Sequence, residues 1–144
     1  MKVKNIISWL NPLNAKYKTT KQIWPYYAEL HKEDKVRHEH VKGTVAGLTS
    51  GAASALATSI GLTASNHPEL WYLIPASFIT LFVSVAYPIV IPSHKKFGEN
   101  RAATLENIWH AILSIPCDFK MCSLEIRGKM KDELKRLSIT KKDK

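Results

Sequence analysis

The chain has 144 residues, which is room for one domain and excludes a multidomain assembly. It carries 21 Lys and Arg against 12 Asp and Glu, a net charge of +9, yet no Asp, Glu, Lys or Arg lies within 43–68 or 70–94. A soluble domain of this size rarely has two such windows, and a membrane-crossing helix needs about 20 mainly apolar residues. The composition therefore predicts an all-α membrane protein, a two-helix transmembrane hairpin flanked by cytoplasmic amphipathic helices.

Two helices are predicted before the hairpin. Apolar residues in 3–13 recur on one helical face, which indicates a short amphipathic helix that either lies on an anionic membrane surface or packs on protein. A second helical pattern covers 26–42, where opposite charges four residues apart can pair. Its His31, Asp34 and His38 share one side, as metal ligands would, but no further strong ligand lies nearby. We therefore expect no metal site in this region.

The first predicted span, 43–64, carries a stripe of small residues on one side. The stripe repeats every four residues and consists of Gly43, Gly47, Gly51, Ala55, Ser59 and Thr63. Helices in lipid associate through close backbone approach, which small side chains permit, so this glycine zipper is predicted to be a helix-packing surface. It faces either the second span of the same chain or another copy of the protein. Some of the hydroxyl groups in this span can bond to carbonyls one turn earlier, and others could line a watery path in an oligomer.

The second predicted span, 70–91, is strongly apolar and anchors the hairpin. Its membrane-interface anchors are predicted to be Trp71 and Tyr72 at one edge and Tyr87 near the other. The reason is that the amphipathic rings of Trp and Tyr gather at the level of the lipid headgroups.

The distribution of basic residues predicts the orientation of the hairpin. Nine Lys and Arg precede Gly43 and twelve follow Pro92, whereas the connection 65–69 has none. Because Lys and Arg accumulate in cytoplasmic flanks, both termini are predicted to be cytoplasmic, next to anionic lipid headgroups. The membrane would be the inner or plasma membrane in a bacterium or phage. In a eukaryote it would be the endoplasmic reticulum, where the terminal Lys141-Lys142-Asp143-Lys144 resembles a dilysine retrieval signal. The predicted regions are 1–42, 43–92 and 93–144.

Two further helices are predicted after the hairpin. The first has a cytoplasmic amphipathic face formed by Leu105, Ile108, Trp109, Ile112 and Leu113. Pro116 is expected to end this helix, and Asp118 to cap another that extends to Leu134. Cys117 and Cys122 lie in the predicted reducing compartment, so we interpret them as small, partly buried thiols and expect neither a disulfide nor a zinc site.

Motifs of known catalytic chemistry are absent from the sequence. There is no nucleophile elbow, no H-E-x-x-H, no phosphate-binding glycine loop and no pair of zinc-type cysteine motifs. The sequence alone therefore predicts a protein that is not an enzyme, with no catalytic, cofactor-binding or metal-binding residues. Nucleic acid is not an expected partner, because acidic residues are interleaved with the basic ones and lipid already accounts for the basic flanks.

Three functions are compatible with this organisation. The first is a non-enzymatic membrane subunit or adaptor, whose stripe packs on its own copies or on other membrane subunits. The second is a self-assembling permeabiliser, because the hairpin with its basic tail resembles a two-span phage holin in outline over 43–144, although no holin-specific motif is present. The third is a membrane-surface or membrane-shaping protein that uses its amphipathic helices as interfacial wedges.

Overall fold

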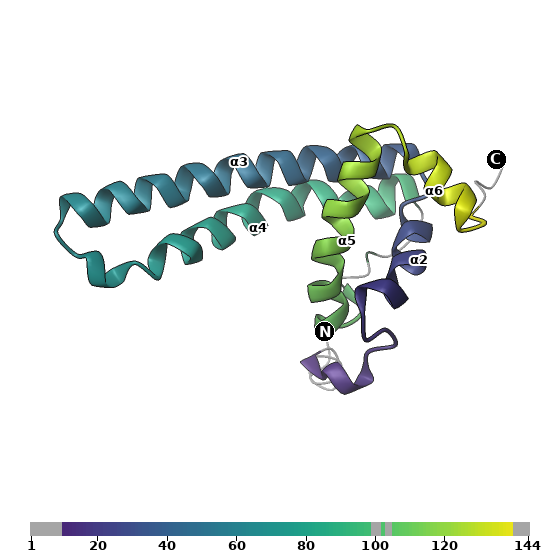
Figure 1. The fold of residues 1–144 in the computed structure, drawn as a ribbon, viewed down its shortest axis with the longest axis horizontal. Helices are drawn as coiled ribbons and strands as arrows, with labels where there is room; N and C mark the ends of the chain where they lie inside the picture. The colour runs from purple at the N-terminus through teal and green to yellow at the C-terminus, as the bar shows by residue number, and fades with distance from the viewer. Residues whose placement is uncertain (1–9, 99–101, 103–104, 140–144) are drawn as a thin grey trace. The chain divides into compact units, whose positions relative to one another are not determined.

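The protein is helical throughout the part of the chain that the structure describes. In this computed structural model that part comprises residues 10–98, 102 and 105–139, and it contains no strand. The α-helices are α2 (Thr20–Leu30), α3 (Asp34–Ala64), α4 (Leu73–Ser93), α5 (Ile108–Ile126) and α6 (Met130–Arg136) (Figure 1). Short 3-10 turns occur at Pro12–Asn14 and Pro68–Leu70, and a π-helical turn occurs at His94–Gly98. The predicted all-α class is therefore confirmed.

The chain divides into two compact units. Unit 1 consists of Met1–His38 and Ile91–Lys144, and unit 2 of Glu39–Val90. Two helices, Asp34–Ala64 and Leu73–Gly98, are long and apolar enough to cross a membrane. In the most apolar 18-residue segment of each helix, only 11% of the residues are buried in the first helix and 6% in the second. Protein therefore covers little of this apolar surface. A soluble core helix would be mostly buried.

In unit 2, α3 and α4 run side by side, and glycines on α3 allow their close approach (Figure 1). A Cβ atom added at Gly43 would lie 2.6 Å from Val90 Cγ2, and one added at Gly47 would lie 2.9 Å from Phe82 Cδ2. At Gly51 the nearest atoms belong to Phe78, at 3.0 Å. The first half of the stripe therefore faces α4 of the same chain.

The second half of the stripe is less covered. Ala55 and Ser59 are half-buried, and Thr63 is exposed. The Thr63 hydroxyl donates to Ser59 O over 2.9 Å, as Thr49 does to Val45 O. These are the bonds to the preceding turn that the sequence predicts. Among the aromatic residues predicted as anchors, Trp71 and Tyr72 are exposed immediately before α4, and Tyr87 is half-buried within it.

Gly47 and Gly61 allow a matched test of the α3–α4 packing, because both lie on α3 but only Gly47 touches α4. Gly47→Ala is expected to destabilise the hairpin by about 1–3 kcal/mol, since the new methyl group must displace Phe82 and Ala86. A Cβ atom added at Gly61 would meet no neighbouring heavy atom within 4 Å. Gly61→Ala should therefore be neutral or slightly stabilising, because alanine favours the helix. Thermal unfolding in detergent, followed by circular dichroism, measures both variants. Equal effects would contradict this packing.

Unit 1 is built on α2 and α5, which pack along each other (Figure 1). Trp24 and Tyr27 from α2 are buried in its core, as are Cys117 and Met121 from α5. Glu133 of α6 links α6 to α2 and α5. Its carboxylate accepts a hydrogen bond from Trp24 Nε1 of α2 at 2.7 Å and forms ion pairs with Lys120 of α5 and with Arg136 of α6. Mainly through the Arg136 hydrogen bond, these contacts lower the pKa of Glu133 to about 2.

Several element boundaries differ from those predicted. The helix predicted over 26–42 is interrupted after Leu30, and α3 then runs without a break from Asp34 through the first span. Pro116 does not end its helix but lies exposed within α5. The predicted amphipathic helix at 3–13 begins outside the described residues, and the dilysine pattern lies wholly outside them.

Candidate metal centre

The candidate site begins at the end of α2, where His31 is held by Tyr27. The two rings stack with centroids 4.1 Å apart and planes 22° apart. His31 Nδ1 lies 2.6 Å from Tyr27 O, one helical turn earlier. A carbonyl oxygen can only accept, so Nδ1 carries the proton and Nε2 has the lone pair. This is the tautomer in which a metal-binding histidine is usually held by its outer-shell partner.

Tyr27 is itself fixed from α5. Its hydroxyl donates to Asp118 Oδ1 over 2.9 Å, and its side chain is buried. Burial, together with the Asp118 carboxylate, raises the pKa of the phenol well above its usual value. Tyr27 therefore stays protonated and orients His31 through both its ring and its carbonyl group.

The second histidine of the site, His94, opens the π-helical turn that follows α4. Its ring meets that of His31 edge to face, with centroids 4.7 Å apart and planes 83° apart. Both residues belong to unit 1, and His31 is 1% and His94 2% exposed. Turns of π-helix occur frequently at functional sites. Two imidazoles buried together at such a turn are the donors that Zn, Cu, Fe and Ni prefer.

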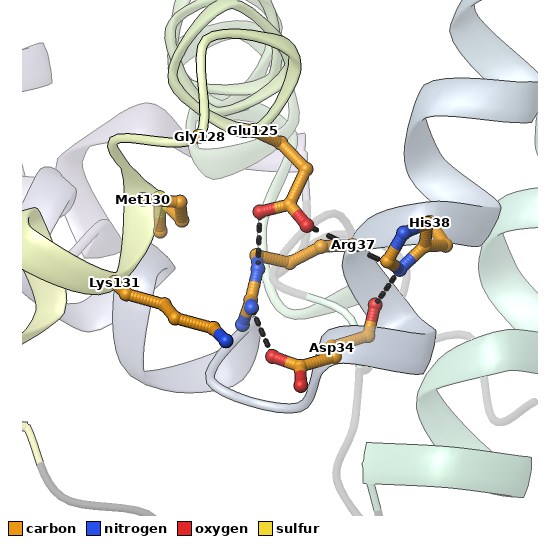
Figure 2. Close-up of a pocket in the computed structure, with 7 residues that line it drawn as sticks. All are labelled: Asp34, Arg37, His38, Glu125, Gly128, Met130 and Lys131. Atoms are coloured by element: carbon orange, nitrogen blue, oxygen red, sulfur yellow. Dashed lines mark hydrogen bonds and ion pairs between the residues drawn. The ribbon is translucent and has the colours of Figure 1, made fainter.

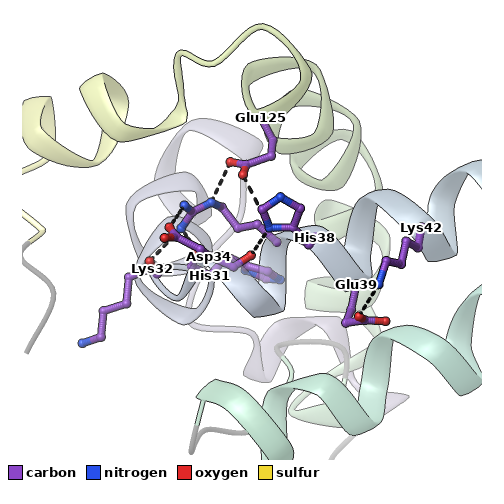
Figure 3. A network of polar contacts seen from close by, with 8 residues as sticks. His31, Lys32, Asp34, His38, Glu39, Lys42 and Glu125 are labelled. Carbon is purple, nitrogen blue, oxygen red and sulfur yellow. Dashed lines mark hydrogen bonds and ion pairs between the residues drawn. The ribbon is translucent and has the colours of Figure 1, made fainter. Parts of the chain in front are cut away.

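Arg37 secures the backbone around His31. Its Nη1 donates to His31 O at 3.0 Å and to Lys32 O at 2.6 Å, and these carbonyls end α2. Its Nε donates to Glu125 Oε2 at 2.7 Å, and its Nη2 binds Asp34 (Figure 2). Figure 3 shows the four residues that accept these bonds, Glu125, Asp34, His31 and Lys32. The Arg37 side chain is only 1% exposed, and four of the five donors of its guanidinium meet carbonyl or carboxylate oxygens.

A pocket of about 260 Å³ lies beside this arginine. Its lining residues are Asp34, Arg37, His38, Glu125, Gly128, Met130 and Lys131 (Figure 2). The carboxylates of Asp34 and Glu125 both bind Arg37, and His38 Nδ1 is directed at Asp34 O at 2.7 Å. The pocket is therefore walled by ion pairs that hold unit 1 together.

The His31–His94 pair fits a shared metal ion. Two metal–nitrogen bonds of about 2.1 Å each span up to about 4.2 Å. The candidate ligand nitrogens of His31 and His94 lie within 4.8 Å of each other, which is close to this span. Tyr27 O occupies Nδ1 of His31, so Nε2 is the nitrogen that could bind a metal. Two imidazoles alone leave most positions around an ion open to other ligands.

Comparison with known families decides the class of this protein. A family described as 2-hydroxy-palmitic acid dioxygenase Mpo1-like matches residues 17–130, which is more than half of the chain. The chain belongs to the Mpo1-like family. The matched segment contains both His31 and His94 and both helices that could cross a membrane. No curated protein sequence and no solved structure matches the chain.

Membership of the Mpo1-like family overturns the function predicted from sequence. The family description names a dioxygenase, so the prediction that the chain is not an enzyme is wrong. The three functions that followed from it, namely a non-enzymatic subunit or adaptor, a holin-like permeabiliser and a membrane-shaping protein, are wrong for the same reason. The motif search failed because the candidate ligands of this Mpo1-like chain come from separate segments and form no local pattern.

The structure also regroups the residues considered for metal binding. Of His31, Asp34 and His38, only His31 enters the histidine pair, whereas Asp34 binds Arg37 and the His38 side chain is 64% exposed. His94 was missed altogether. A signal for it exists in the Mpo1-like sequence, because this histidine ends the long apolar run and precedes Lys95 and Lys96. Cys117 and Cys122 are both buried, and neither is in a disulfide.

Proposed function

We propose that the protein is a membrane-bound, metal-dependent dioxygenase of long-chain 2-hydroxy fatty acids. The observation that carries this proposal is the buried His31–His94 pair within the segment that matches the Mpo1-like family. The family description supplies the substrate class, and the two imidazoles supply donors for a metal that handles O₂. Iron(II) is the ion we propose, because open sites with histidine ligands are typical of non-haem iron oxygenases. When bound, the ion would supply the site at which O₂ and the 2-hydroxy acid react.

Neighbouring residues hold His31 in a fixed orientation. Tyr27 directs the lone pair of His31 Nε2, and Arg37 holds the carbonyl of the same histidine, so the ligand has little freedom to rotate. Burial of His31 and His94 keeps water from competing around the ligands. Orienting groups of this kind usually contribute 10- to 100-fold to metal affinity or activity.

We further propose that α3 and α4 cross a membrane with both termini on the cytoplasmic side. Their exposed apolar surface supports insertion, and the absence of Lys and Arg from 65–69 supports the orientation. A long-chain fatty acid is itself dissolved in the bilayer, so a membrane location brings the enzyme to its substrate.

The test uses the full chain reconstituted in lipid and loaded with iron(II) under anaerobic conditions. After 2-hydroxypalmitic acid and ¹⁸O₂ are added, we expect O₂ consumption that depends on the acid, together with ¹⁸O in the fatty-acid product. Palmitic acid, which lacks the hydroxyl group, is the matched control and should give no consumption. If both acids are inert with metal bound, the proposal is wrong.

A further inference from the structure

The helix α5 is apolar on two opposite faces. One face carries Leu113, Cys117 and Met121, which are buried in unit 1. The other carries Ile112, Ile115, Phe119 and Ile126, whose exposed fractions are 49%, 50%, 44% and 70%. These four positions are spaced three, four and seven residues apart, so they lie on one side of the helix, which we call the outer face of α5.

A surface helix normally has one apolar face and one polar face. A helix that is apolar all round is covered on both sides, by protein or by lipid. Large neighbouring apolar side chains exposed together mark an interaction surface, whereas a single exposed leucine does not. The outer face of α5 therefore requires a partner.

The lipid bilayer is the partner that best fits this surface. Unit 1 is joined covalently to the two apolar helices at His38–Glu39 and at Val90–Ile91, so these helices hold it at the membrane if they are inserted. Arg127 and Lys129 follow the outer face directly and are exposed. Basic residues beside an apolar helical face are typical of a helix that lies in the interface of an anionic membrane.

We propose that α5 lies in the membrane interface, with Ile112, Ile115, Phe119 and Ile126 inserted among the lipids. This inference rests on the proposed membrane location of the enzyme. It places unit 1, with its histidine pair, on the surface from which a fatty acid would be taken. Interfacial helices bury their apolar face about 5–10 Å into the boundary between headgroups and acyl chains.

A nitroxide label attached to Phe119→Cys tests the inference. The full chain is reconstituted in vesicles made from equal parts of phosphatidylcholine and phosphatidylglycerol. We expect the label at this position to collide several-fold more often with O₂, which concentrates in lipid, than with a water-soluble nickel chelate. A label at Lys135→Cys, which is exposed on α6, should show the opposite preference. The wild-type chain gives the background, because Cys117 and Cys122 are buried.

Three results separate the possible outcomes. A label at Ile79→Cys, exposed in the middle of α4, must report the hydrocarbon interior, and its failure to do so would overturn the membrane location itself. If Ile79→Cys reports lipid while Phe119→Cys is as accessible to the chelate as Lys135→Cys, the inference is wrong. Magnetic coupling between labels at Phe119→Cys that disappears on dilution with lipid would instead identify a second copy as the partner, which also overturns the inference.

Discussion

Replacing His94 with alanine is expected to abolish metal binding and the oxidation of 2-hydroxypalmitic acid together. The change removes one of two imidazoles that meet with ring centroids 4.7 Å apart. We expect turnover to fall more than about 100-fold, because loss of outer-shell partners alone costs 10- to 100-fold. Elemental analysis of the purified chain gives metal per protein, and an oxygen electrode gives turnover.

His38→Ala is the matched control for this prediction. Its side chain is 64% exposed, and it lies outside the histidine pair, so metal content and turnover should stay near those of the wild type. His94→Gln preserves most of the buried volume and separates loss of the ligand from loss of packing. If His94→Ala or His94→Gln retains wild-type metal and turnover, His94 is not a ligand and the proposed centre is wrong.

Arg37→Met is expected to destabilise unit 1 by about 3–5 kcal/mol, the usual result of removing one partner from a buried ion pair. The side chain of Arg37 is 1% exposed, and its loss leaves the Glu125 carboxylate and the His31 carbonyl without their donors. For a chain of this size the melting temperature should fall by about 10 °C. Thermal unfolding in detergent, monitored by tryptophan fluorescence, measures this change.

Two further variants sharpen the test of Arg37. Arg127→Met removes an exposed arginine whose Nε donates only to Ser123 O within its own helix, so its effect should stay below about 1 kcal/mol. The double variant Arg37→Met with Glu125→Leu no longer leaves the half-buried Glu125 carboxylate without its arginine, and it should recover part of the stability. Equal melting temperatures for Arg37→Met and Arg127→Met would contradict the structural role of Arg37.

The apolar helices were predictable from sequence because their signal is local. The predicted span 43–64 falls within α3, and the predicted span 70–91 falls within the Leu73–Gly98 helix except for its first three residues. Both spans could be predicted because length and absence of charge are properties of neighbouring residues in the sequence. The start of α3 at Asp34 was not predicted, because the helical pattern over 26–42 hides the break after Leu30. Pro116 misled because proline usually ends a helix, whereas here it lies within α5.

The histidine pair was not predictable in the same way. In the sequence, His31 precedes the whole hairpin and His94 follows it. Only the packing of α2 against the segment after α4 brings their rings together. His31, Asp34 and His38 looked like a set because helical spacing was assumed to continue through a stretch where the chain in fact breaks. Ligands contributed by separate elements leave no periodic signal in one sequence.

The environment of the cysteines matters for a protein that handles O₂. Cys117 is fully buried, and burial raises the pKa of its thiol from 9.0 to about 11. At neutral pH the thiolate, which is the form that peroxides attack, is therefore about 100-fold scarcer than for an ordinary cysteine. Cys122 is 6% exposed on the same helix. The proposed dioxygenase would meet reactive oxygen species whenever turnover misfires, and burial keeps the Cys117 sulfur in the protonated form that resists them.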